Sequence, residues 1–320
     1  MLGEDDDYDD YDDFMDVFFS GPEPEPLGPP PETEDLDFLS FLKEELPLPG
    51  PPPPNDKALM PEILIRSLNG VKTAGWHYNP RSDRHSIIKC LGTLLDLVRS
   101  SPLLESQLLE RKVVFGINSK VGNKYLDLVI GLPEVWAGSQ LPRSFGEWSN
   151  QVDLQWDPSE LSCLDKIGDL QEGTIGLPLL AIEAKAVMTD HAGALPRVSD
   201  ELERFRFRVQ DQAINAALVM VNTAEDFISP GRNGYDPTRF PLNVSTHKQP
   251  SDAEKVLGML SKLPLREDKS AGFDSIGVVC LDCPNNGQPS TLCDLAPQEL
   301  SYPYLVERLS GRYEQRFSSL

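Results

Sequence analysis

The sequence predicts an α/β protein in which a central mixed β-sheet is flanked by helices. Apolar runs of strand length alternate with segments of 3.6-residue periodicity, and their order is helix, three strands, helix, strand. The start of the chain, by contrast, is acidic, rich in proline and without either period. We therefore expect one layered domain over residues 57–320, a length that is large but allowed for a single core.

Residues 1–56 are expected to form a disordered acidic tail. They hold 18 Asp or Glu residues, one Lys and 12 of the 29 prolines, which leaves only −5 of the net charge of −22 to the other 264 residues. Such a composition buries too little apolar surface to offset chain entropy. Its acidic-hydrophobic clusters suit either a solubilising tail or a docking segment for a protein partner. The charge would also suit autoinhibition by competition with nucleic-acid phosphates.

The sequence gives no sign of export or membrane insertion. The acidic start is the opposite of a basic signal-peptide region, and no run approaches 18 apolar residues. The five cysteines are an odd number, which favours reduced thiols in a cytoplasmic, intracellular protein. Among them Cys280, Cys283 and Cys293 lack an evident fourth ligand for zinc.

The first half of the domain is predicted from one helix and a hairpin. Ser82 or Asp83 can cap a helix that Pro102 ends, and a short segment over residues 103–109 follows. Residues 112–117 and 124–131 are expected to be strands joined by a turn. The apolar positions of the helix keep the 3.6 period: Ile87, Ile88, Leu91, Leu94, Leu95 and Val98.

An insertion over residues 132–177 separates this half from the next. Its three tryptophans stand among Gly, Pro and Ser without a sustained period, so an elaborated loop is expected. Trp136, Trp148 and Trp156 can stack on bases if exposed, but at least two of them are expected to anchor the loop in the core.

The second half continues with alternating strands and helices. Strands are expected over residues 178–188, 216–221 and 276–281. A helix with one apolar stripe follows the first of them, and the sequence Ser251-Asp252-Ala253-Glu254 predicts a capping box at the start of another. A final helix is expected near residues 300–314. The stripe consists of Val198, Leu202, Phe205 and Val209.

Three charged residues interrupt the predicted apolar strands. Glu183 and Lys185 fall on one face of the strand over residues 178–188, roughly 6–7 Å apart along it. Asp127 repeats the pattern on the strand over residues 124–131. Charge on a buried strand is costly unless it is paired or holds a metal.

These groups suit metal-assisted hydrolysis of a phosphodiester. Mg²⁺ takes carboxylate oxygens, often one or two from the protein, with waters and substrate phosphate completing its shell. Asp127 and Glu183 are therefore candidate metal ligands. Lys185 would position the attacking water or stabilise developing negative charge.

At this point the chain resembles the PD-(D/E)xK superfamily of restriction-endonuclease-like nucleases, in which an acid on one core strand is followed by Glu-x-Lys on the next. The resemblance covers roughly residues 84–222. It departs from the pattern in two ways: Leu126 stands where the motif has Pro, and 55 residues separate Asp127 from Glu183. The resemblance implies a restriction-endonuclease-like core and a DNA endonuclease that uses Mg²⁺ or Mn²⁺.

The resemblance also implies a third site acid and a homodimer that cuts both strands. Asp96, Glu105 and Glu110, from the first helices, are the candidates for that acid. Cations for DNA contact are expected on two helices: Arg197, Arg204 and Arg208 on one, and Arg84 and Lys89 on the other. Ordinary solvated helix faces would look the same.

Three alternatives stay open at the level of sequence. The same residues would form a buried ion pair that only closes the core. The protein could also be a catalytically inactive nuclease fold that binds DNA or a protein partner, with the tail as docking or autoinhibitory segment. An enzyme acting on RNA has the same residue pattern. The triplet alone is weak, because Glu267-Asp268-Lys269 also fits it in a polar stretch.

Overall fold

A six-stranded mixed sheet lies at the centre of the protein, in the order β1-β2-β3-β4-β7-β8. Strands β1, β2 and β3 pair antiparallel, β3, β4 and β7 pair parallel, and β8 returns antiparallel to β7. The predicted mixed α/β architecture is therefore confirmed. The strands are β1 (Val114–Val121), β2 (Lys124–Pro133), β3 (Ile175–Val187), β4 (Ile214–Asn222), β7 (Ser275–Asp282) and β8 (Thr291–Cys293).

The structure is a computed structural model and describes residues 58–70, 76–121, 124–134, 143–208, 213–236, 238–266 and 272–320. All of these belong to one compact unit, Leu42–Leu320. The acidic tail over residues 1–56 lies outside the described residues, as does Trp136. No described helix combines the length and the apolar character needed to cross a membrane.

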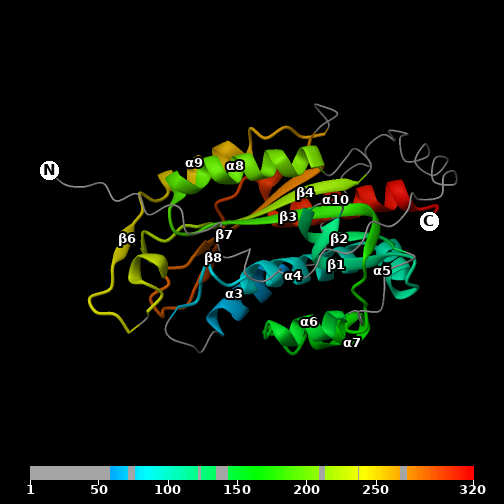
Figure 1. Cartoon of the computed structure of the whole chain (residues 1–320), viewed down its shortest axis with the longest axis horizontal. Coiled ribbons are helices and arrows are strands. Elements are labelled where there is room, and N and C mark those ends of the chain that lie inside the picture. The colour runs from blue at the N-terminus through cyan, green and yellow to red at the C-terminus, as the bar shows by residue number, and fades with distance from the viewer. Residues whose placement is uncertain are drawn as a thin grey trace, which may run out of the picture. The chain divides into compact units, whose positions relative to one another are not determined.

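Helices cover both faces of the sheet (Figure 1). Helices α8 and α9 pack together on one face, and α4 and α10 lie on the other, with α3 against α4. The α-helices are α3 (Met60–Asn69), α4 (Arg84–Ser100), α5 (Pro102–Leu109), α6 (Phe145–Gln151), α7 (Leu161–Ile167), α8 (His191–Arg208), α9 (Ser251–Leu260) and α10 (Tyr302–Phe317). The smaller elements are the hairpin strands β5 (Asp226–Ile228) and β6 (Val244–Thr246) and the 3₁₀ turns η1 (Gly231–Asn233) and η2 (Gln298–Leu300).

Helix α4 is buried on all sides rather than on one stripe. Every residue from 87 to 98 is buried, because the helix contacts the sheet, α3, α6 and α10. Polar side chains on this helix must therefore find partners inside the protein.

The β2–β3 ladder positions the two strands that carry the charged residues. The ladder runs to Leu128 opposite Ile182 and has an irregularity at Gly131. A Cβ atom at Gly131 would lie 2.3 Å from the backbone oxygen of Leu177, so only glycine allows this close approach.

The expected loop over residues 132–177 is the main error in the predicted fold. Strand β2 extends to Pro133 and β3 starts at Ile175, so both strands reach into the segment. Helices α6 and α7 lie between them, and Ser144 and Glu147 form a capping box at the start of α6.

The other capping box was predicted at the wrong place. Pro250 is the N-cap of α9, with no side-chain cap. Two tryptophans anchor the insertion as expected: Trp148 donates to Glu172 and Trp156 donates to Ser149.

Candidate active site

Asp127 and Ala184 meet where strands β2 and β3 stop pairing. The ladder ends one residue before Asp127, whose carboxylate then accepts a hydrogen bond of 2.7 Å from the backbone N–H of Ala184. This bond fixes the Asp127 carboxylate against the middle residue of the Glu-x-Lys triplet. The structure thus brings together Asp127, Glu183 and Lys185.

Lys185 lies between two carboxylates. Its ammonium group is 2.7 Å from Glu183 and 2.9 Å from Glu201 of α8. Lys185 is 22% exposed and Glu201 38%, so water reaches the cluster and the pair is not sealed inside the core. This distinguishes the site from an ion pair that only closes the core.

Glu201 is a site residue that the sequence analysis missed. Helix α8 begins at His191, whose ring hydrogen-bonds to the carbonyl of Asn222 at 2.8 Å, and packs Leu202 and Phe205 into the core of this face. Glu201 directly precedes Leu202 and therefore faces the sheet beside the apolar stripe. An acid next to the stripe of the helix that follows Glu-x-Lys was the available signal.

Lys89 approaches the same strand from α4. It is 1% exposed, and its ammonium donates a hydrogen bond of 2.8 Å to the backbone oxygen of Lys185. Burial lowers the pKa of Lys89 to about 8, although the charge of Asp127 acts to raise it. Lys89 therefore belongs with the charged cluster and not with the surface cations among which it was predicted.

The cluster carries an excess of negative charge. Burial, followed by the charge of Asp127, raises the pKa of Glu183 to about 7, although Lys185 acts to lower it. For Lys185, burial acts to lower the pKa, but the charges of Glu183, Glu201 and Asp127 outweigh it and raise the value. Three carboxylates face two ammonium groups, so a further cation would be attracted to the cluster.

The donor set fits a sparsely ligated hard cation. No group of three or more His, Cys, Asp or Glu side chains is arranged to hold a metal within the described residues, which includes all five cysteines. Mg²⁺, however, often takes only one or two protein carboxylates and keeps several waters. Asp127 and Glu183 provide two such groups beside solvent.

The predicted third acids lie elsewhere. Asp96 accepts hydrogen bonds from the backbone N–H groups of Leu59 and Met60 and from the hydroxyl of Tyr302, so it holds the start of α3. Glu105 lies in the first turn of α5, and Glu110 is exposed beside Lys112. Glu201 occupies the place in the cluster for which these three were considered.

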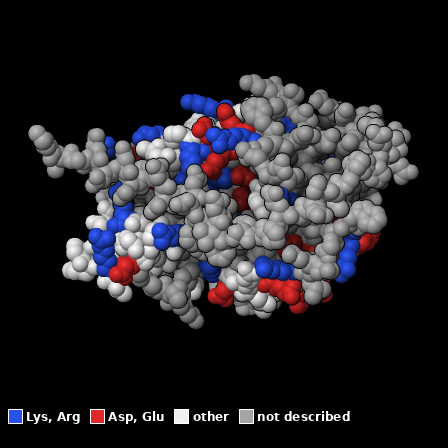
Figure 2. All heavy atoms as spheres, in the orientation of Figure 1, with Lys and Arg blue, Asp and Glu red and all other residues white. Residues whose placement is uncertain are grey.

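The predicted DNA-contacting cations are divided between surface and interior. Arg197 and Arg204 are exposed on α8, and Arg208 ends this helix with its side chain outside the described part. Arg84 instead donates to the backbone oxygens of Ser67 and Val152, which ties α4 to α3 and the insertion. Figure 2 shows Lys and Arg side chains next to Asp and Glu side chains over α8.

Comparison with known proteins finds no relative: no protein-family model, curated protein or solved structure matches this chain.

Proposed function

We propose that the protein is a metal-dependent endonuclease that hydrolyses DNA phosphodiester bonds. The observation that carries the proposal is the convergence of Asp127 from β2 with Glu183 and Lys185 from β3 at the point where the strands separate, beside solvent. An acid on one core strand and Glu-x-Lys on the next is also the pattern of a restriction-endonuclease-like core, which we propose for the sheet β1-β2-β3-β4 and helices α4 and α8.

Each residue of the cluster has a distinct part in this proposal. Asp127 and Glu183 would hold Mg²⁺ or Mn²⁺, which when bound lowers the pKa of a water and offsets charge on the phosphate. The ammonium of Lys185 would orient that water or stabilise the oxygen that gains negative charge. Glu201 keeps this ammonium in place, and Lys89 holds the backbone of the triplet.

The substrate is proposed as DNA on two grounds. The resemblance implies it, and the exposed Arg197 and Arg204 lie on the same helix as Glu201. The described domain is not basic overall, so phosphate contact depends on such local groups. A homodimer that cuts both strands follows from the resemblance alone.

Incubation of the full-length chain with plasmid DNA and Mg²⁺ or Mn²⁺ tests the activity. Wild type is expected to nick or linearise the plasmid, and Lys185→Met to slow this by about a hundredfold or more, because one charge-stabilising group is lost. Glu183→Gln is expected to have a similar effect. The double variant Glu267→Gln, Lys269→Met is the matched control, because it changes the other acid-x-Lys triplet of the chain.

Metal binding provides a second test that does not require cleavage. Mn²⁺ binding, followed by electron paramagnetic resonance, should weaken in Glu183→Gln and in Asp127→Asn but not in the control. Binding of DNA without cleavage under either metal or on RNA would instead favour the inactive nuclease fold. Loss of cleavage in the control would show that the assay follows a contaminant.

A further inference from the structure

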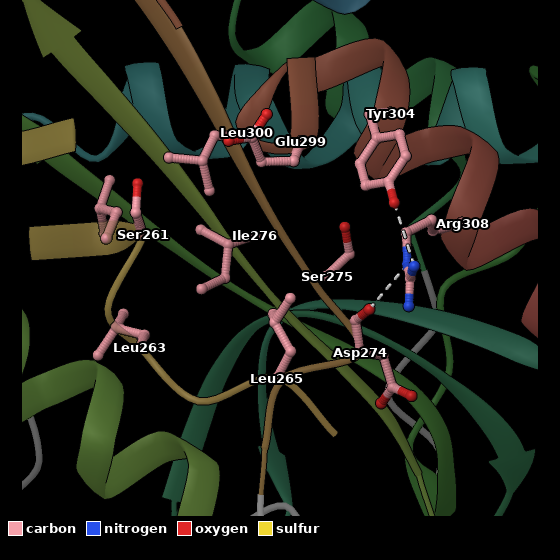
Figure 3. Close-up of a pocket in the computed structure, with 11 residues that line it drawn as sticks. Ser261, Leu263, Leu265, Asp274, Ser275, Ile276, Glu299, Leu300, Tyr304 and Arg308 are labelled. Atoms are coloured by element: carbon pink, nitrogen blue, oxygen red, sulfur yellow. Dashed lines mark hydrogen bonds between the residues drawn. The ribbon is translucent and has the colours of Figure 1, made fainter. Parts of the chain in front are cut away.

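A second pocket lies apart from the charged cluster, at the start of β7. It has a volume of about 100 Å³ and opens between the end of α9, η2 and the first turns of α10 (Figure 3). None of its lining residues belongs to the cluster around Glu183. They are Leu260, Ser261, Leu263, Leu265, Asp274, Ser275, Ile276, Glu299, Leu300, Tyr304 and Arg308.

The pocket occurs where the edge of β7 is only partly covered. Strand β8 pairs with β7 at Cys280–Asp282, at the far end of the strand. Among the described residues, only a single bridge between Val278 and Ser301 lies on that side nearer to Ser275. The gap between this edge and α10 is therefore filled by side chains alone, and these leave the cavity.

One wall of the pocket is apolar. Leu260 and Ile276 belong to elements of the core, and Leu300 reaches in from η2. Figure 3 shows Leu263 and Leu265 on the same side as Ile276, away from Tyr304 and Arg308. A ligand that fills this side must present an aliphatic group, because no polar partner would compensate a desolvated polar one.

The opposite end is polar and offers hydrogen-bond donors. Ser275 is 1% exposed, and its hydroxyl has no hydrogen-bond partner in the structure. Figure 3 shows this hydroxyl directed into the space between Ile276 and Tyr304. Buried hydroxyl groups are rarely left without a partner, so the group indicates a missing ligand atom or water.

Tyr304 and Arg308 complete this end. The hydroxyl of Tyr304 accepts a hydrogen bond of 3.1 Å from Arg308 and so keeps its own proton for another acceptor. Arg308 also donates to the backbone oxygen of Asp274 at 3.3 Å. Together these residues present one positive charge and two hydroxyl groups.

The nearby carboxylate of Asp274 does not cancel this charge. It forms ion pairs with Arg266 and Arg312 and accepts from the backbone N–H of Asn215. Figure 3 shows it turned away from the cavity. Arginine thus outnumbers Asp274 at the floor of the pocket, and Glu299 is the remaining acid, exposed at the rim.

We propose that this pocket binds a carboxylate carried on a short, branched aliphatic group of about four to six carbons. The carboxylate would accept from Arg308, Tyr304 and Ser275, and the aliphatic group would cover the leucine side. The size follows from the volume, since a cavity of about 150 Å³ holds one benzene molecule and this one is smaller but open at its mouth. A free acid and an aliphatic amino acid share this chemistry.

Calorimetric titration of the full-length protein with 4-methylpentanoate tests the proposal. We expect saturable binding with one molecule per chain, and no comparable binding of 4-methylpentan-1-ol or 4-methylpentylamine. Leucine, with and without Glu299→Gln, distinguishes the two sources. If Glu299 holds an ammonium group, leucine binds more tightly than the acid and loses this advantage in the variant; otherwise the acid binds more tightly.

Two variants locate the binding. Arg308→Gln should weaken it by about tenfold or more, because a charge-assisted hydrogen bond is lost. Ser275→Ala should weaken it several-fold without affecting the fold, since its hydroxyl makes no bond in the free protein. Arg239→Gln, at an exposed arginine, is the control. Absence of saturable binding, equal binding of the alcohol, or binding unchanged in Ser275→Ala would overturn the proposal.

Discussion

Replacing Asp96 by alanine tests how the first helices are held together. The buried carboxylate of Asp96 accepts hydrogen bonds of 2.9 Å from the backbone N–H of Leu59, from that of Met60 and from the hydroxyl of Tyr302. Helix α3 has no side-chain cap of its own. Asp96→Ala therefore leaves the start of α3 and a buried hydroxyl without an acceptor.

The expected loss follows from these contacts. A buried donor left unsatisfied costs about 1–3 kcal/mol. Three donors are affected, but Leu59 is partly exposed, and alanine also removes the cost of burying a charge. We therefore expect the free energy of unfolding to fall by about 3–5 kcal/mol, as when a buried polar network is broken. This is a large part of the roughly 5–15 kcal/mol that stabilises a typical domain.

Asparagine at the same position adds a pH dependence with a defined sign. Burial raises the pKa of Asp96 above its ordinary 3.8, against the opposing effect of its hydrogen bonds. The folded state thus holds the proton more tightly, and the stability that this provides is full below pH 3.8 and lost as the pH rises through the folded pKa. Asparagine does not titrate, so the stability gap between wild type and Asp96→Asn should narrow as the pH rises.

Urea unfolding followed by tryptophan fluorescence, at several pH values between 3.8 and neutrality, measures both effects. Glu110→Ala is the control, because this exposed residue pairs only with its neighbours Ser106 and Lys112 among the contacts described. The argument is refuted if Asp96→Ala is no more destabilising than the control, or if the gap for asparagine widens with pH.

Three further predictions concern single contacts. Glu201→Gln should slow DNA cleavage by about tenfold, less than Lys185→Met, because the glutamine still accepts a hydrogen bond but no longer holds the ammonium by charge; equal losses in a rate assay would contradict a positioning role. Ser144→Ala should lower the free energy of unfolding by about 1 kcal/mol through loss of the cap of α6, measured by urea unfolding. Gly131→Ala should cost about 1–3 kcal/mol in the same assay because of the close backbone contact, and an unchanged stability would show that the strands relax freely.

The central strands could be predicted because their signal is local. The runs over residues 124–131, 178–188, 216–221 and 276–281 are apolar, of strand length and rich in branched side chains, and each lies within a strand of the sheet or overlaps one closely. The short helices α6 and α7 escaped prediction because seven residues are too few to show a period.

Capping boxes show how context decides between equal local patterns. Ser144-x-x-Glu147 and Ser251-x-x-Glu254 have the same form, but only the first makes both bonds. At the second, Asp252 instead accepts from the backbone of Lys248. The helix begins one residue earlier than the pattern indicates, with Pro250 as its N-cap.

The candidate site was predictable only along the strands. Asp127, Glu183 and Lys185 break apolar runs, which is visible in one dimension. Glu201 and Lys89 come from helices on opposite faces of the sheet, so their meeting at Lys185 depends on tertiary packing. Lys89 was expected at the surface because a helical lysine normally is, whereas α4 has no exposed face along its middle.

The burial of α4 links two parts of the molecule that differ in purpose. Lys89 reaches the Glu-x-Lys strand, and Asp96, seven residues later and roughly 10 Å along the axis, holds α3. A displacement of this rod would move both attachments together, because neither end is free to adjust in the close-packed interior. Removal of α3 should therefore alter the surroundings of Lys185 from a distance, and evolution of the amino-terminal segment is constrained by chemistry it never touches.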